Sequence, residues 1–473
     1  MRAHEAGALH AEGYGGPAWL PVPHDVNALL PGLWSAGVRR SDGGSLVVAG
    51  VDVHELAERF GTPAYVVDEE DLRARARAFR AAFTEAFAEP AGGADVYYAG
   101  KAFLCTAIAR WVAEEGLHLD ASTGGELAVA LRAGVPPQRI GLHGNNKSDE
   151  EIETALRAGI GRLVLDSAEE VGRVADAADR LGLTRPVPVL VRVTVGVEAH
   201  THSYIATAHE DQKFGVPMDD APAVVADALA RPQLELRGLH SHIGSQIFDT
   251  AGFEVAAQRV LRLHADIARR HGVELPELDL GGGFGIRYTS QHDPQPVEEI
   301  AAGMARVVLA ECRALGVAVP RVSVEPGRAI AGPSTFTLYR VGTVKDLELD
   351  GGLRRRYVAV DGGMSDNVRT ALYDADYSCS LASRASTAPP VLSRVVGKHC
   401  ESGDIVVKDE YLPGDVRRGD LLAVPATGAY SRSLASQYNH VPRPPVVAVR
   451  DGEARVIVRR ETIEDILALD VAG

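Results

Sequence analysis

Polar side chains follow apolar, strand-like segments at regular intervals through the first two thirds of the chain. Lys101 comes just after the segment Asp95–Ala99, and Glu325 ends the segment Arg321–Glu325. In a parallel α/β barrel, catalytic side chains lie where strands end and the following loops begin. The polar segments at these ends are Tyr97–Lys101, Asp120–Glu126, His143–Lys147, Arg192, His240–Gln246, Gly281–Gly285 and Glu325–Arg328. Loops are polar in any protein, but a set drawn from seven strand ends indicates one shared site.

The glycine run Gly281–Gly283 indicates an anion-binding loop. Successive backbone N–H groups without side chains can approach an anion closely. Barrels often hold phosphate at the loops after strands seven and eight, where this run and Gly327-Arg328 fall. Ser245, after strand six, adds a hydroxyl donor. The alternative is a tight turn that needs positive φ, so the position of the run carries the argument.

Lys101 and Glu325 have the chemistry of a pyridoxal phosphate (PLP) site. A lysine whose stem packs in an apolar wall places its amine in the cavity, where it is a candidate to form a Schiff base. A carboxylate facing that lysine and the phosphate loop suits the pyridinium nitrogen of PLP, which it keeps protonated. The alternatives are a surface lysine at a strand end and a salt bridge within the barrel.

Regular alternation of strands and helices positions these residues. Eight strands separated by helices over roughly 240 residues predict a closed (β/α)₈ barrel, with a doubly wound open sheet as the alternative. The predicted strands are Asp95–Ala99, Leu117–Asp120, Ile140–Gly144, Arg162–Leu165, Val187–Val195, Leu236–His242, Leu278–Leu280 and Arg321–Glu325. The predicted helices include Glu69–Phe87, Gly125–Ala133, Asp149–Ala158, Ala168–Leu181, Pro222–Ala230, Ala251–Arg270 and Glu298–Leu315.

Composition divides the 473-residue chain into four parts. Residues 1–45 are rich in Gly, Pro, Ala and His and predict an extension. Residues 46–68 predict strands that join a β domain, residues 69–335 the barrel, and residues 336–473 a mainly β domain of short, turn-separated strands.

Composition also limits the class of function. The net charge of −15 argues against a nucleic-acid-binding protein, which usually has a basic face. No apolar run reaches the ~20 residues that cross a bilayer, and we expect neither a signal peptide nor membrane association. The cysteines Cys105, Cys312, Cys379 and Cys400 form no CxxC pair, which is typical of a reducing cytoplasm and indicates no zinc site.

Four motifs in the same order resemble the fold-type III PLP decarboxylases: Tyr98–Lys101, His240–Gln246, Leu278–Gly285 and Glu325–Arg328. That group includes diaminopimelate, ornithine and arginine decarboxylases and shares its barrel with alanine racemase. The resemblance runs from about residue 50 to the C-terminus. It implies an alanine racemase-like (β/α)₈ barrel with a second, mainly β domain.

Finer details resemble the diaminopimelate decarboxylase family, in its actinobacterial form. The motifs are Gly196–His202, Asp211–Gly215, Asp361–Met364, Arg369 with Tyr373, Gly397–Asp404 and Thr427–Tyr430. Two positions depart from the expected pattern near a flexible active-site loop. Thr194-Val195 stands where Asn-Pro is common, and Ala208 stands where Gly is common, which could alter the motion of the loop.

The resemblance implies a role for each motif residue. Lys101 would form the Schiff base, His242 would stack on the PLP ring, and Cys400 would protonate the carbanion after CO₂ leaves. The cofactor-binding residues would be Lys101, His242, Ser245, Gly283, Glu325, Pro326, Gly327, Arg328 and Tyr430. The substrate-binding residues would be Arg328, Arg369, Tyr373, Glu401 and Tyr430. A homodimer with shared active sites also follows from the resemblance alone.

Two arginines suit a substrate with a carboxylate at its unreacting end, because arginine pairs bidentately with carboxylate. Glu401 would bind the distal ammonium. The predicted reaction is the decarboxylation of meso-2,6-diaminopimelate to L-lysine and CO₂, the last step of lysine biosynthesis. The alternatives are a decarboxylase of ornithine, lysine or arginine, a racemase, and a silent PLP-binding protein. Arg328 and Arg369 argue against the first, and Lys101 with Cys400 argues against the last.

Overall fold

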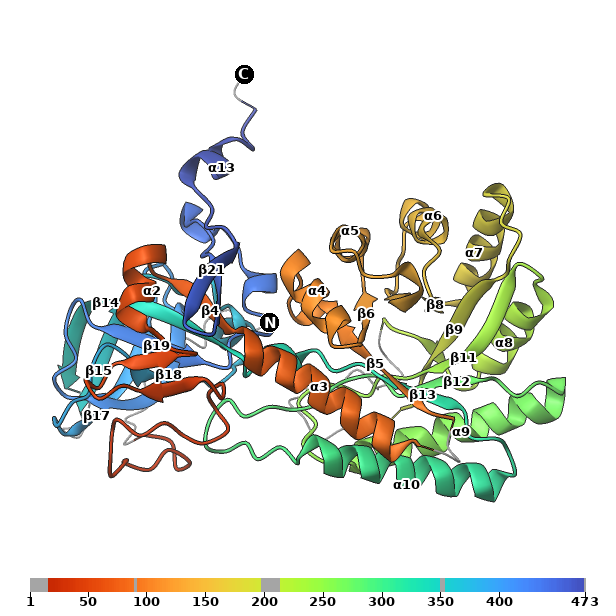
Figure 1. Cartoon of the computed structure of the whole chain (residues 1–473), viewed down its shortest axis with the longest axis horizontal. Helices are drawn as coiled ribbons and strands as arrows, with labels where there is room; N and C mark the ends of the chain where they lie inside the picture. The colour runs from red at the N-terminus through yellow and green to blue at the C-terminus, as the bar shows by residue number, and fades with distance from the viewer. Residues whose placement is uncertain (1–15, 89–91, 197–212, 349–353, 472–473) are drawn as a thin grey trace. The chain divides into compact units, whose positions relative to one another are not determined.

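The computed structural model describes residues 16–88, 92–196, 213–348 and 354–471 (Figure 1). It divides into two compact units. The β unit comprises the described residues up to Leu72, Arg287–Asp293, and those from Ala331 onward; the barrel unit comprises Arg73–Ile286 and Pro294–Ile330. No helix in these ranges is both long and apolar enough to cross a membrane.

Eight parallel strands of the barrel unit form a closed ring. The strands are β5 (Ala94–Ala99), β6 (His118–Ala121), β7 (Ile140–Leu142), β8 (Arg162–Leu165), β9 (Val187–Thr194), β11 (Leu234–His240), β12 (Glu277–Asp279) and β13 (Arg321–Val324). Each strand pairs with the next in the chain, β8 pairs with β9, and β13 returns to β5. The predicted (β/α)₈ barrel is therefore confirmed, and the open sheet is excluded, because closure leaves no edge between β5 and β13.

One helix precedes the first barrel strand and the others follow barrel strands. They are α3 (Glu69–Ala86), α4 (Thr106–Glu114), α5 (Gly124–Arg132), α6 (Asp149–Ala158), α7 (Ala168–Arg180), α8 (Ala221–Ala230), α9 (Ala251–His271) and α10 (Val297–Leu315). Local sequence sets their ends. At α6, Ser148 and Glu151 form a capping box, and Gly159 ends the helix in the left-handed conformation at φ 70°. The capping box of α6 fixes where the loop after β7 ends, and this loop carries the polar segment His143–Lys147.

The β unit is built around a nine-stranded sheet. Its main path runs β18 (Ile405–Pro413), β17 (Pro390–Val396), β15 (Arg354–Val360), β14 (Thr335–Glu348), β4 (Ala64–Asp68), β20 (Val446–Arg450) and β21 (Glu453–Val458). Off this path, β19 (Leu421–Pro425) pairs with β14 and with β16 (Ser380–Leu381). All five residues of β4 are buried. A strand that precedes the barrel in sequence is therefore central to a sheet that is otherwise built after it.

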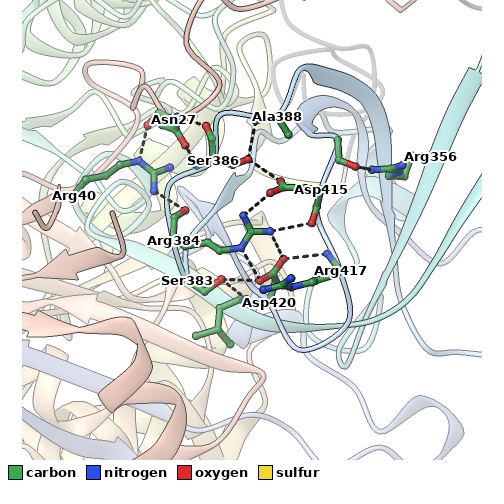
Figure 2. Close-up of polar contacts among 12 residues, drawn as sticks. Asn27, Arg40, Arg356, Ser383, Arg384, Ser386, Ala388, Asp415, Arg417 and Asp420 are labelled. Atoms are coloured by element: carbon green, nitrogen blue, oxygen red, sulfur yellow. Dashed lines mark hydrogen bonds and ion pairs between the residues drawn. The ribbon is translucent and has the colours of Figure 1, made fainter. Parts of the chain in front are cut away.

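The described part of the N-terminal segment is tied to the β unit. It contains β1 (Val38–Arg40), which pairs with β2 (Leu46–Val48). Asn27 exchanges two hydrogen bonds of 2.8 Å with the backbone of Ser386, and Arg40 donates to the carbonyl oxygens of Asn27 and Leu381 at 2.6 and 3.0 Å. Figure 2 shows Asn27 and Arg40 beside a second polar cluster around Arg384 and Asp420. These side chain-to-backbone bonds hold the segment in one register against the β unit.

Candidate active site

The structure distributes the predicted site residues over both units. The barrel unit carries Lys101, His242, Ser245, Gly283, Glu325, Pro326, Gly327 and Arg328, all beyond the carboxyl ends of its strands. The β unit carries Arg369, Tyr373, Cys400, Glu401 and Tyr430. Each group is described within its own unit.

Glycines bring the loops after strands β11, β12 and β13 into close contact. Gly281 and Gly283 have φ of 70° and 108°, in the region that favours glycine. A Cβ on Gly281, Gly282 or Gly283 would lie 2.3–2.5 Å from a backbone oxygen of a neighbouring loop. Close packing alone accounts for the three glycines. The run also carries no side chains, so an anion could approach its backbone closely at Gly283, the least buried of the three glycines.

A buried cation lies beside a hydroxyl at this cradle. Arg328, which follows β13 at the start of the short helix α11 (Arg328–Ala331), donates from Nη2 to Ser245 Oγ at 2.9 Å. Arg328 is only 7% exposed. Charged guanidinium groups are seldom buried unless they pair with another group. The pair therefore brings a cation and a hydroxyl donor together where an anionic group could bind.

His242 is oriented by the glycine run. Its Nδ1 accepts a hydrogen bond of 3.1 Å from the backbone N–H of Gly282. Burial, reinforced by the nearby charge of Lys101, lowers the pKa of His242 well below its usual value. The imidazole is therefore neutral, with its proton on Nε2, because Nδ1 is an acceptor. A neutral, fixed ring suits a stacking role.

Lys101 follows a barrel strand, as the sequence predicts, but its exposure differs from the prediction. It follows β5 in the 3₁₀ turn Gly100–Ala102, and its side chain is exposed. The expectation of an amine desolvated by an apolar wall is therefore wrong. Lys101 lies in a turn beyond the end of β5, where a side chain is less enclosed than one within the strand.

Glu325 lies in a buried group of charged residues that the sequence analysis did not assemble. His240 Nε2 lies 3.0 Å from Glu325 Oε1, and burial raises the pKa of Glu325. Arg162 forms a buried ion pair with Asp279. Arg162 and Asp279 were missed as a pair because they stand at the ends of two strands that lie far apart in the sequence. A charged residue within a short apolar strand was the available signal.

Arg369 is the main buried cation of the β unit site. It begins the short helix α12 (Arg369–Tyr373), is 3% exposed, and donates from Nη1 to Tyr377 Oη at 2.5 Å. The guanidinium carbon lies 4.8 Å from the centre of the Tyr288 ring. Although burial opposes the charge, Tyr288 and Tyr377 keep the pKa of Arg369 above its usual value. No carboxylate in the described ranges pairs with it within 4.0 Å, which fits an anionic ligand.

The segment around Cys400 has a fixed backbone and exposed side chains. The Asp404 carboxylate accepts from the backbone N–H groups of His399 and Met364 at 2.7 and 2.6 Å. Asn439 Oδ1 accepts from the backbone N–H of Cys400 at 3.1 Å. Cys400 and Glu401 themselves are exposed. Sequence reasoning found these two residues but not Asn439, which lies in a distant loop without a recognisable motif.

Tyr430 and Tyr373 are half-buried. Tyr430 follows β19 with φ 63°, a backbone conformation unusual for tyrosine. Just before it, a Cβ on Gly428 would lie 1.8 Å from the carbonyl oxygen of Ala331. This close approach fixes the turn that presents Tyr430. Tyr373 ends the helix that Arg369 begins.

Several motif residues lie outside the described residues, namely 197–202, Ala208, Asp211 and Gln212. The first departure from the expected pattern is described. Thr194 Oγ1 donates to the Phe214 carbonyl at 2.7 Å, and Arg259 donates to the Val195 carbonyl. Thr194 thus ties the end of β9 to the chain at Phe214.

The barrel unit residues fit PLP. Glycine backbone and the Arg328–Ser245 pair suit its phosphate, the neutral ring of His242 suits stacking, and Glu325 suits the ring nitrogen. Within the described ranges no hydrogen bond reaches the second oxygen of Glu325, Oε2, because the contacts of the carboxylate are made by Oε1.

Comparison with known proteins defines the class. Residues 69–332 match the family described as pyridoxal-dependent decarboxylase, pyridoxal binding domain. With the closed barrel and the site above, this makes the chain a pyridoxal-dependent decarboxylase.

The relatives give the particular family. The diaminopimelate decarboxylase of Mycobacterium tuberculosis is 54% identical over 449 residues, 94% of this chain and 98% of that protein. That of Mycobacterium leprae is 52% identical over the whole of both chains. The crystal structure of diaminopimelate decarboxylase from M. jannaschii in co-complex with L-lysine matches with a TM-score of 0.85 and 30% identity, over 93% of this chain and 98% of that one. This chain belongs to the diaminopimelate decarboxylase family.

Proposed function

We propose that this chain is a carboxy-lyase that converts meso-2,6-diaminopimelate to L-lysine and CO₂ with PLP as cofactor. The observation that carries the choice of substrate is Arg369, a buried guanidinium without a carboxylate partner among the described residues. Diaminopimelate has a carboxylate at its unreacting end, whereas ornithine and arginine do not. Relatives that bear the name diaminopimelate decarboxylase over nearly the whole chain support this choice.

In this proposal the cofactor is held by the barrel unit, within residues 69–335. Lys101 binds it through its amine, His242 lies on the ring face, and Glu325 holds the ring nitrogen. Ser245, Gly283, Pro326, Gly327 and Arg328 surround the phosphate, and Tyr430 adds a further contact. When bound, PLP supplies an electron-poor ring that accepts the electron pair left by CO₂.

The remaining residues bind the substrate and move a proton. Arg328 and Arg369 bind carboxylate, Tyr373 and Tyr430 contact the substrate, and Glu401 pairs with the distal ammonium. Cys400 would donate its thiol proton at the substrate carbon, and Lys101 would hold the cofactor through its amine between turnovers.

A panel of amino acids tests the reaction. The purified protein with PLP is incubated in parallel with meso-diaminopimelate, ornithine, arginine and lysine, and the products are identified by amino-acid analysis. Lysine formed only from meso-diaminopimelate supports the proposal. Putrescine, agmatine or cadaverine would instead support a decarboxylase of another basic amino acid and would reject the roles of Arg328, Arg369 and Glu401.

We also propose a cytoplasmic homodimer in which Cys400 of one subunit serves the site of the other. The exposed thiol on a fixed backbone supports this arrangement. Mixing the inactive Lys101→Ala and Cys400→Ala proteins tests it, because a mixed dimer with shared sites contains one intact site. Recovery of activity supports shared sites, and no recovery after demonstrated subunit exchange rejects them.

A further inference from the structure

Two histidines meet the same oxygen of Glu325. His240, which ends β11, places Nε2 3.0 Å from Glu325 Oε1, and His143, which follows β7, places Nε2 3.4 Å from it. His143 Nε2 also lies 3.1 Å from Asp120 Oδ1. His240, His143, Glu325 and Asp120 are all less than 10% exposed. Both histidines contact Oε1 of Glu325, and neither contacts Oε2.

Both histidines are neutral. Burial lowers the pKa of His143 to about 4 and that of His240 well below its usual value. A neutral imidazole has one N–H and one bare nitrogen. Next to a carboxylate oxygen, the favoured tautomer has its proton on Nε2. The N–H then points toward the oxygen, whereas a bare nitrogen would place its lone pair against the lone pairs of the carboxylate. His240 is the stronger donor, because only its contact has hydrogen-bond geometry.

The same three side chains have the spacing of a metal site, because one ligand atom from each lies within 4.8 Å of the others. Arg162 argues against a metal. Its Nη2 lies 4.0 Å from Glu325 Oε1 and 3.7 Å from Asp120 Oδ1, and it pairs with Asp279. A guanidinium thus already supplies the positive charge, and a divalent cation in the same space would be repelled by it.

We propose that His240, assisted by His143, is a positioning residue that fixes the Glu325 carboxylate through Oε1 and so presents Oε2 to the ring nitrogen of PLP. The inference rests on the proposed role of Glu325. A carboxylate that accepts a hydrogen bond from His240 at one oxygen, with the His143 ring packed 3.4 Å from the same oxygen, cannot rotate freely. Glu325 Oε2 is then already in position when the cofactor nitrogen binds, so binding does not have to restrict the rotation of the carboxylate.

The hydrogen bond from His240 also favours the charged form of Glu325, against the rise in its pKa that burial causes. Burial raises the pKa of Glu325, as does Asp120, whereas the positive charges of Arg162 and Lys101 lower it. A hydrogen bond donated to the ionised carboxylate favours that form. The charged and titratable groups that face Glu325 are Asp120, His143, Arg162, Arg192, His240, Asp279 and Lys101. Removing the donor at position 240 therefore raises the pKa of Glu325, and the carboxylate becomes neutral at a higher pH.

A pair of substitutions at position 240 tests this. His240→Leu removes the donor, and His240→Gln retains an amide N–H. In the holoprotein we measure the absorbance of bound PLP against pH, the dissociation constant of PLP, and kcat and KM. His240→Leu should move the acid transition of the absorbance to higher pH, weaken PLP binding about tenfold, and lower kcat more than KM rises. His240→Gln should restore much of the wild-type behaviour.

A matched control is His264→Leu. His264 is a buried histidine on α9 whose ring nitrogens bond to no described residue, so its loss tests the general cost of removing a buried imidazole. It should leave the acid transition unchanged. If His240→Leu does not fold, His143→Leu tests the same idea, with a smaller shift in the same direction expected.

Other outcomes overturn the inference. A folded His240→Leu protein with an unaltered acid transition and PLP affinity rejects it, and so does a bound metal that is lost with His240. Glu325→Gln separates the two proposals. If Glu325→Gln alters the absorbance and activity while His240→Leu alters neither, only this inference fails. If Glu325→Gln alters neither, the proposed role of Glu325 itself fails.

Discussion

The two units bury charge in different ways. In the barrel unit, Glu325 is met by His240 and His143, and Arg162 is paired with Asp279, so these two buried charges have partners from their own chain. In the β unit, Arg369 is equally buried but is held by tyrosines instead of a carboxylate. A charge that is already balanced serves to hold a permanent group. A charge left unbalanced is available to a ligand that comes and goes.

The units also differ in how they present reactive groups. Glycine backbone and buried side chains make the barrel unit site. In the β unit, backbone hydrogen bonds to Asp404 and Asn439 fix the chain while Cys400 remains exposed. Substitution of Lys101 or Glu325 should therefore affect cofactor binding, whereas substitution of Arg369 or Cys400 should affect substrate binding or proton transfer without loss of the cofactor.

The largest effect is expected from Lys101→Ala. Loss of the amine should abolish turnover and the visible absorbance of bound PLP, because the covalent attachment is lost. Steady-state assay and a spectrum of the purified protein measure both. Lys345→Ala, an exposed lysine of the β unit, serves as control and should behave as wild type. Substantial residual turnover in Lys101→Ala would reject the attachment role.

Cys400→Ala should lower kcat by about 10²- to 10⁴-fold, the usual contribution of a positioned acid. The spectrum of bound PLP should not change. This result would contrast most clearly with Lys101→Ala in the barrel unit, which should abolish the spectrum. The neighbouring exposed Ser402→Ala is the control. A spectrum altered as strongly as in Lys101→Ala would contradict the division of roles.

Arg369→Ala should raise the KM for meso-diaminopimelate by about ten- to a hundredfold with a smaller change in kcat. The arginine binds the unreacting end, and a hydrogen bond to a charged group contributes about 1.5–3 kcal/mol. Binding of L-lysine, which keeps that carboxylate, should weaken in parallel, whereas binding of cadaverine, which lacks it, should not. The exposed Arg418→Ala is the control. An unchanged dependence on substrate concentration would exclude this role.

The smallest effect is expected from Asn439→Ala. It removes the acceptor for the Cys400 backbone N–H, so kcat should fall by about two- to tenfold through looser placement of the thiol. PLP binding and the melting temperature should change little, since the Asp404 contacts remain. A loss as large as in Cys400→Ala would mean that Asn439 acts directly on the reacting groups.

Much of the fold followed from periodicity, and the failures have a clear cause. The strand predicted at Asp95–Ala99 is observed as Ala94–Ala99, because apolar side chains mark a buried parallel strand directly. The strand β17 was not predicted. It begins at a proline and contains Ser393 and Arg394, both buried, so no apolar run marks it.

Some residues of the candidate site were also predicted from the sequence, whereas others were not. Lys101 and Glu325 were predicted from their positions at strand ends. Arg162 and Asp279 lie 117 positions apart and are recognisable as a pair only once the barrel has closed. The fixed backbone around Cys400 likewise depends on Asn439, 39 positions away. Sequence spacing shows groups carried by one strand end, whereas partnerships between strands require the fold.

The position of β4 has a consequence for synthesis. This strand pairs with β14 and with β20, whose residues Val446–Val449 lie about 380 positions after their partners Tyr65–Asp68. At roughly 5–20 residues per second, a ribosome takes tens of seconds to make the intervening chain. The barrel unit, encoded almost entirely within that interval, is free to close first. The β4 strand must meanwhile keep one edge from other chains until β14 emerges, and the other until β20 emerges near the end of synthesis.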